Sequence, residues 1–128
     1  MLLVEDEEHS RLALQRLLQS RGFQVTAVES AEEALYLLEH ANGSPPCYMV
    51  VDVDLPGING MELICKALVG RPKLHAMLVT AADQTLVKNF ATEHDVDYFP
   101  KPLDVNRFFA HLRMASSHHR HRPMTNSA

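Results

Sequence analysis

The 128-residue sequence has no tryptophan, only two cysteines, and no apolar run of membrane-spanning length. A membrane-spanning helix needs about 20 consecutive apolar residues, so we expect no membrane association. Cys47 and Cys65 form neither a CxxC motif nor a His/Cys metal spacing, which favours reduced thiols over a disulfide. Acidic residues directly follow the short apolar segment 1–4, so the sequence shows no signal peptide. These absences together predict a cytoplasmic protein.

The sequence also lacks an excess of basic residues. Its net charge is −4, which gives no indication of direct nucleic-acid binding. The hydrophobic share of 46% is that of an ordinary globular protein, and 128 residues can enclose one sizeable core. We expect one domain over residues 1–115. Residues 116–128 have no apolar periodicity and are predicted to form a flexible tail or the start of a linker.

Short apolar runs alternate with helical patterns along the chain. The predicted strands are Leu2–Val4, Gln24–Val28, Tyr48–Val51, Ala76–Val79 and Asp97–Pro100. The predicted helices are one ending near Arg21, one opening at a Ser30 capping box, one after Gly60, one around Thr85–Glu93 and one capped by Asp104. Five strand–helix units predict an α/β fold with a parallel sheet and right-handed crossovers.

Polar residues follow four of the five predicted strands. Glu5 and Asp6 follow the first strand, Asp52 the third, Thr80 the fourth and Lys101 the fifth. Ligands bind at the carboxyl ends of strands in open α/β sheets, so we expect these side chains to meet. Several carboxylates suit Mg²⁺, and a lysine with a hydroxyl suits phosphoryl oxygens. The joint pattern predicts a phosphoryl-transfer site in which an aspartate is the nucleophile.

Four motifs, LLVEDE, VVDVDLPGING, LVTA and YFPKP, occur in an order and spacing that resemble the receiver domain of bacterial two-component response regulators. The resemblance covers residues 1 to about 115. It implies a (βα)5 flavodoxin-like, CheY-like, doubly wound parallel sheet with strand order 2-1-3-4-5. It also implies a phosphoacceptor that assists its own phosphorylation and dephosphorylation, rather than a turnover enzyme.

The resemblance assigns the acidic residues of the site. It implies that Asp52 is the phosphoacceptor and that Glu5 and Asp6 bind Mg²⁺ or Mn²⁺ with it. Asp54 matches the position that gives the metal a backbone carbonyl, so its side chain need not be a ligand. Glu5 stands where aspartate is commoner, which preserves the charge.

The resemblance also assigns the phosphate-binding and switch residues. Thr80, Ala81 and Lys101 match the phosphate-binding positions, and Thr80 with Tyr98 matches the pair that moves on activation. Switching is expected to remodel the face made by the fourth helix, the fifth strand and the fifth helix. Pro102 follows Lys101 where the family typically has a cis peptide bond.

The implied partners are a sensor histidine kinase or a histidine phosphotransfer protein, and a downstream protein or fused output domain. Receivers attached to winged-helix domains form a salt-bridged dimer through an acid and an arginine after the site lysine. This sequence has Arg107 and His111 at those positions, and Lys88 is the expected facing residue. Like charges across an interface are unfavourable, so we do not expect that dimer.

Two alternative functions stay open from the residues. Asp52 and Asp54 form a DxD pattern, as in haloacid-dehalogenase-type phosphatases, although that family places DxD on its first strand. A degenerate receiver acting only as an interaction module is the other alternative. A separate metal site at the tail histidines His118, His119 and His121 is a weaker hypothesis.

Overall fold

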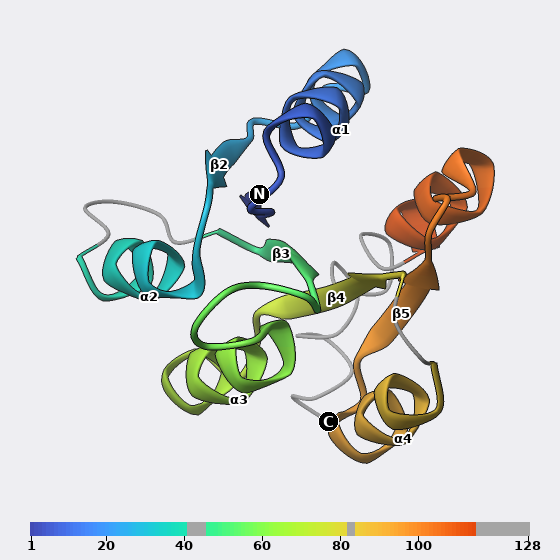
Figure 1. The fold of residues 1–128 in the computed structure, drawn as a ribbon. Helices are drawn as coiled ribbons and strands as arrows, with labels where there is room; N and C mark the ends of the chain where they lie inside the picture. The colour runs from blue at the N-terminus through green and yellow to red at the C-terminus, as the bar shows by residue number, and fades with distance from the viewer. Residues whose placement is uncertain (41–45, 82–83, 115–128) are drawn as a thin grey trace, which may run out of the picture.

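The computed structural model describes residues 1–40, 46–81 and 84–114. Strands and helices alternate along the chain (Figure 1). They are β1 (Leu2–Val4), α1 (Glu8–Ser20), β2 (Thr26–Val28), α2 (Ala31–Glu39), β3 (Tyr48–Asp52), α3 (Gly60–Gly70), β4 (His75–Thr80), α4 (Gln84–His94) and β5 (Asp97–Pro100). A further helix, here the C-terminal helix, covers residues 105–114. The tail predicted at 116–128 lies outside the described residues.

The strands form one parallel sheet in the order β2-β1-β3-β4-β5, which confirms the predicted fold class and topology. Val4 of β1 lies beside Val51 of β3, and Asp52 lies beside Val79 of β4. At the far side Thr80 lies beside Pro100 of β5. The carboxyl ends of β1, β3, β4 and β5 therefore meet along one edge of the sheet, which we call the carboxyl edge.

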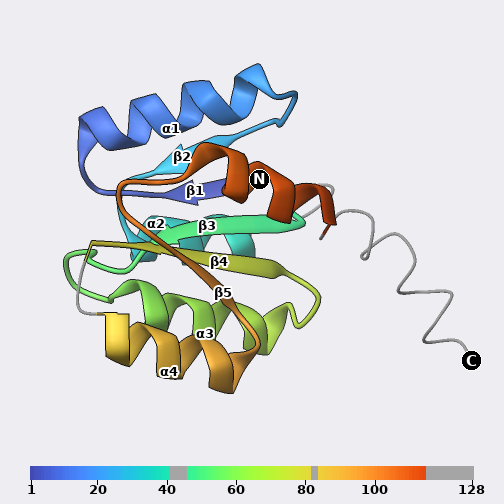
Figure 2. The same cartoon turned by 90° about the vertical axis from the view of Figure 1, so that its right-hand side faces the viewer.

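Helices cover both faces of the sheet (Figure 2). Side chains alternate along each strand and fill two cores, one on each face. Leu3, Val50 and Met77 point towards α1 and the C-terminal helix, where they pack with Leu18 and Phe108. The residues on either side of them in the strands point to the other face. There they pack against α2, α3 and α4 in a second core that includes Leu2, Val4, Met49, Val51, Ala31, Leu63 and Val87.

Side-chain caps at the predicted positions begin two of the helices. Ser30 accepts a hydrogen bond from the Glu33 backbone N–H at 3.2 Å, and Asp104 accepts one from Arg107 N–H at 3.2 Å. Asp95 has a φ of 54°, a left-handed conformation that aspartate tolerates better than most residues. Among the described residues, no helix is both long and apolar enough to span a membrane.

Candidate functional site

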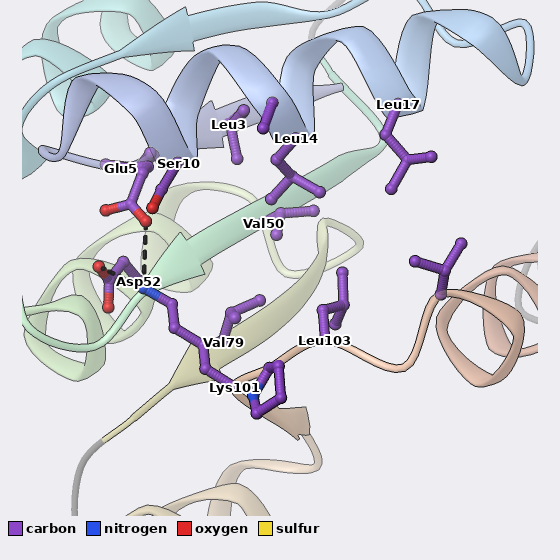
Figure 3. A pocket seen from close by; sticks show the side chains of 14 residues that line it. Leu3, Glu5, Ser10, Leu14, Leu17, Val50, Asp52, Val79, Lys101 and Leu103 are labelled. Atoms are coloured by element: carbon purple, nitrogen blue, oxygen red, sulfur yellow. Dashed lines mark hydrogen bonds and ion pairs between the residues drawn. The ribbon is translucent and has the colours of Figure 1, made fainter.

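Three charged side chains from three strand ends meet at the carboxyl edge (Figure 3). Lys101, just after β5, places its Nζ 3.1 Å from Glu5 Oε1 and 3.3 Å from Asp52 Oδ2. Glu5 follows β1 and Asp52 ends β3, so the sheet brings together residues that are 49 and 96 positions from the lysine. Only 5% of the Glu5 side chain and 7% of the Asp52 side chain are exposed. Carboxylates this buried require partners, and Lys101 supplies one to both.

The chain after β3 holds the Asp52 carboxylate in place. The Val53 backbone N–H continues the sheet pairing by donating to Val79 O at 3.1 Å. The Asp54 N–H then donates to Asp52 Oδ1 at 3.0 Å. Because Lys101 contacts the other oxygen, Oδ2, both oxygens of the carboxylate have a donor and its orientation is defined.

The acidic loop after β1 is held by its own contacts. The Glu5 N–H donates to Val28 O at 3.1 Å, which extends the pairing with β2 by one residue. Arg11 of α1 reaches back and donates through Nη1 to the carbonyls of Glu5, at 3.2 Å, and Asp6, at 3.3 Å. These contacts fix the backbone of the loop from which the side chains of Glu5 and Asp6 extend.

Burial is the main influence on the electrostatics of Glu5. Desolvation, together with the hydrogen bonding and negative charge of Asp52, raises the Glu5 pKa to about 7, against a smaller lowering by Lys101. Burial lowers the Lys101 pKa, but the two carboxylates outweigh this effect and leave the pKa raised. Lys101 therefore stays cationic at neutral pH, while Glu5 holds its proton more tightly than an exposed glutamate does.

The donor set at this edge suits a hard divalent cation. Glu5, Asp6 and Asp52 each offer a carboxylate oxygen, and these oxygens all lie within 4.8 Å of one another. Mg²⁺ prefers oxygen ligands, keeps several waters and is held by few carboxylates. The Asp6 side chain is exposed, so the group opens to solvent on one side, where a hydrated ion and a phosphoryl donor can approach.

The remaining predicted residues lie on or directly after β3, β4 and β5. Thr80 is fully buried at the end of β4, and its carbonyl accepts from Lys101 N–H at 2.8 Å. Ala81, directly after Thr80, and Asp54, two residues after Asp52, are exposed. Tyr98 is half-buried against the core on the α4 side. The Lys101–Pro102 peptide bond is cis, the isomer that the resemblance implied.

An apolar cavity continues from the charged cluster between α1 and the C-terminal segment. Its volume is about 290 Å³. Leu14 and Leu17 of α1 line one side, and Leu103 and Val105 line the other (Figure 3). The Glu5, Asp52 and Lys101 side chains thus lie between this apolar cavity and the solvent-exposed loop that carries Asp6.

Two residues behind the site were not recognised from the sequence. Asn59 caps α3 by accepting from the Glu62 N–H at 2.9 Å, and an Asn three residues before a Glu was an available signal. Gly60 packs so close behind β3 that a Cβ there would lie 2.9 Å from Val53 Cα and would also overlap the Asp52 carbonyl. This close approach is a tertiary feature, for which the sequence gives no signal.

Comparison with known proteins shows which family this sequence matches. The family model described as "Response regulator receiver domain" matches residues 1–113. The chain is 35% identical over 112 residues to the transcriptional regulatory protein CreB of Escherichia coli K12, covering 87% of this chain and 48% of CreB. It is 33% identical over 106 residues to a cyclic di-GMP phosphodiesterase of Thermotoga maritima, covering 82% of this chain and 27% of that protein.

A solved structure has the same fold. A receiver domain protein (CheY-like) from Methanospirillum hungatei JF-1 superposes with a TM-score of 0.85 at 21% identity, covering 94% of this chain and 95% of the other. This chain covers nearly all of that structure, but it spans only about a quarter to a half of the length of the curated relatives that it matches. The phosphatase hypothesis finds no support in these matches, and the family match extends over nearly all described residues. The chain belongs to the response regulator receiver domain family.

Proposed function

We propose that this domain receives a phosphoryl group on Asp52 and signals through the face formed by α4, β5 and the C-terminal helix. The observation that carries the proposal is the contact of Lys101 with both Asp52 and Glu5, which joins three strand ends into one site. Burying a carboxylate costs free energy even when it is paired. A receiver that is never phosphorylated would gain no function in return for that cost at Asp52.

The transfer is a nucleophilic displacement at phosphorus. Asp52 Oδ forms a bond to phosphorus while the phosphorus–nitrogen bond of a phosphohistidine donor breaks, and the electron pair leaves with the imidazole nitrogen. Lys101 then binds an oxygen of the transferred group, and its positive charge stabilises the charge developing there. Thr80 and the backbone of Ala81 complete the phosphate-binding set.

Glu5, Asp6, Asp52 and the backbone carbonyl of Asp54 would hold Mg²⁺ or Mn²⁺. The bound cation supplies neutralisation of the phosphoryl oxygens and of the carboxylate cluster. The residues fit such an ion because all the donor atoms are oxygens. One carboxylate oxygen from each of Glu5, Asp6 and Asp52 lies within 4.8 Å of the other two. Glu5→Gln combined with Asp6→Asn should abolish Mg²⁺ binding in titration calorimetry, and unchanged affinity would place the metal elsewhere.

Phosphorylation can be tested by intact-mass measurement with acetyl phosphate and Mg²⁺. We expect one added phosphoryl group, absent from Asp52→Asn. Asp54→Asn is the matched control, because it removes an exposed carboxylate two residues away and should be labelled normally. Label persisting in Asp52→Asn would refute the assignment, and an unlabelled wild-type chain would favour the degenerate receiver.

The switch is proposed to couple β4 to β5. A phosphoryl oxygen is a strong acceptor for the Thr80 hydroxyl, and movement of Thr80 leaves room for Tyr98 to turn inward. Thr80→Val keeps the volume and loses the donor, so Asp52 should still be labelled while partner binding falls. A Thr80→Val protein that binds its partner like wild type would place the switch elsewhere.

The proposed donor is a sensor histidine kinase or a histidine phosphotransfer protein in the cytoplasm. The recipient is a downstream protein or a fused output domain, without direct contact of this domain with nucleic acid or membrane. In this scheme the domain is a stoichiometric phosphoacceptor that assists its own phosphorylation and dephosphorylation, not an enzyme with a separate substrate.

A further inference from the structure

A second group of metal-binding side chains lies at the opposite edge of the sheet from Asp52. His75 begins β4, Asp97 begins β5, and His111 lies on the C-terminal helix. The strands that carry Thr80 and Lys101 at their carboxyl ends thus carry His75 and Asp97 at their amino ends. No role in phosphoryl transfer involves these three side chains.

The three side chains converge on one point. His111 Nε2 lies 2.9 Å from Asp97 Oδ2 and 3.2 Å from His75 Nε2, and His75 Nε2 lies 3.7 Å from the same Asp97 oxygen. Each ring thus directs its Nε2 to the other ring and to a shared carboxylate oxygen.

These separations match the coordination shell of a small cation. Ligands about 2.0 to 2.2 Å from a tetrahedral Zn²⁺ lie roughly 3.3 to 3.6 Å from one another. The observed separations of 2.9, 3.2 and 3.7 Å bracket that range. Side-chain shifts of a few tenths of an ångström would therefore bring the three atoms to the spacing of zinc ligands. Two imidazoles with one carboxylate are a donor set typical of Zn²⁺ and unlike the all-oxygen set that suits Mg²⁺.

Neighbouring aromatic rings hold both imidazoles in place. His75 packs edge-on to Tyr48, with ring centroids 5.8 Å apart, and His111 packs edge-on to Phe99 at 5.5 Å. Phe108 and Leu112 anchor the C-terminal helix in the core on either side of His111. Preorganised ligand rings lower the entropic cost of binding a metal.

The site is open enough for an ion to enter. The side chains of His75 and His111 are 29% and 27% exposed, and that of Asp97 is 48% exposed. Three protein ligands and an accessible fourth position leave room for a water molecule on the metal.

We propose that His75, Asp97 and His111 form a Zn²⁺ site that ties β4, β5 and the C-terminal helix together at the edge of the sheet remote from Asp52. The site is independent of the proposed phosphoryl transfer. It uses the imidazoles of the folded domain rather than the tail histidines.

The test uses the full chain in which His118, His119 and His121 are all replaced by Asn, so that the tail cannot supply imidazole ligands. Titration calorimetry with Zn²⁺ should show one ion bound per chain. Adding His111→Asn, or separately Asp97→Asn, should weaken binding by at least about tenfold. His40→Asn is the matched control, because His40 is an exposed histidine stacked on Tyr36 at the end of α2.

Spectroscopy identifies the ligands directly. Zn²⁺ should shift the ring-nitrogen NMR signals of His75 and His111, and millimolar Mg²⁺ should leave those signals unmoved. Circular dichroism with a chelator present establishes that each variant is folded. Loss of binding in the tail-substituted chain would assign the metal to the tail, and Zn²⁺ binding unaffected by both His111→Asn and Asp97→Asn would equally overturn the proposal.

Discussion

At the scale of single residues, the central feature is a lysine shared by two buried carboxylates. Lys101 lies within 3.3 Å of an oxygen of both Asp52 and Glu5, yet one positive charge does not neutralise two negative ones. The excess negative charge is what a bound divalent cation would balance. Burial first, and then the nearby negative charge of Asp52, raise the pKa of Glu5.

Glu5→Gln should stabilise the metal-free domain at pH 8. The folded-state pKa of Glu5 is about 7, above its ordinary 4.5, so the folded state holds the Glu5 proton more tightly than the unfolded state does. Its contribution to stability is therefore lost as the pH rises from 4.5 through 7. Gln mimics the protonated form, and urea unfolding with a chelator should show a gain of about 1 to 2 kcal/mol at pH 8.

The same gain should disappear near pH 4.5, where wild-type Glu5 is protonated. Glu39→Gln serves as the control, because Glu39 is exposed at the end of α2. A variant less stable than wild type at pH 8 would mean that the ion pair with Lys101 outweighs desolvation.

Lys101→Met should separate cation binding from phosphoryl transfer. Removing the positive charge next to Glu5 and Asp52 makes the cluster more attractive to a cation, so Mg²⁺ affinity at pH 8 should rise severalfold. Labelling by acetyl phosphate should slow by about 100-fold, because the group that would stabilise the phosphoryl oxygens is lost. Calorimetry and timed intact-mass measurement check the two effects, and weaker Mg²⁺ binding would show that Lys101 organises the carboxylates rather than competing for them.

At the scale of elements, the parallel sheet explains why much of the site could be predicted. Parallel strands bring their carboxyl ends to one edge, so polar residues after separate apolar runs had to meet. The length of β2 was predicted less well: Gln24–Val28 was expected and Thr26–Val28 is observed. β2 pairs only with β1, whose three residues leave no partner for a longer strand.

The opposite edge could not be predicted in the same way. His75, Asp97 and His111 belong to two strands and a helix, and no motif or spacing links them. Their convergence depends on how the C-terminal helix packs on the sheet and on the ring orientations set by Tyr48 and Phe99. Such packing is decided by the assembled core, so only the structure reveals it.

Gly60, at the start of α3, packs directly against the backbone of Asp52 and Val53. Gly60→Ala should destabilise the domain by about 2 kcal/mol, because the new Cβ would press on the backbone of Asp52 and Val53. Gly70→Ala, at the other end of the same helix, is the matched control, since a Cβ there meets no atom within 4 Å. Thermal or urea unfolding compares the two variants.

Gly60→Ala should also reduce the rate of Asp52 labelling, since the displaced backbone carries the carboxylate. Equal stability of the two alanine variants would show that the loop before α3 relaxes freely and does not brace Asp52.

At the scale of the whole molecule, the two proposed sites lie at opposite ends of the same strands. β4 and β5 run from the His75–Asp97 edge to the Thr80–Lys101 edge, and the proposed switch acts through the same two strands. The proposed switch and the proposed Zn²⁺ site would therefore both act on the surface of β5 and the C-terminal helix.

We expect the domain to stay monomeric, or to dimerise through another surface, when activated. The salt-bridged receiver dimer needs an acid where this chain has Arg107 and an arginine where it has His111. Arg107 and Lys88 are both exposed cations, so a partner chain would set like charges against each other. His111 already pairs with Asp97 of its own chain at 2.9 Å, which occupies both groups within the monomer.

Sedimentation velocity with and without beryllofluoride and Mg²⁺ measures this directly. A monomer under both conditions, at concentrations where Asp52 is fully occupied, is the expected result. A dimer that forms with beryllofluoride and is lost on Asp97→Ala or Arg107→Ala would contradict the electrostatic argument. It would show that the α4–β5 surface pairs despite its cations, and would favour an output through a dimeric DNA-binding regulator.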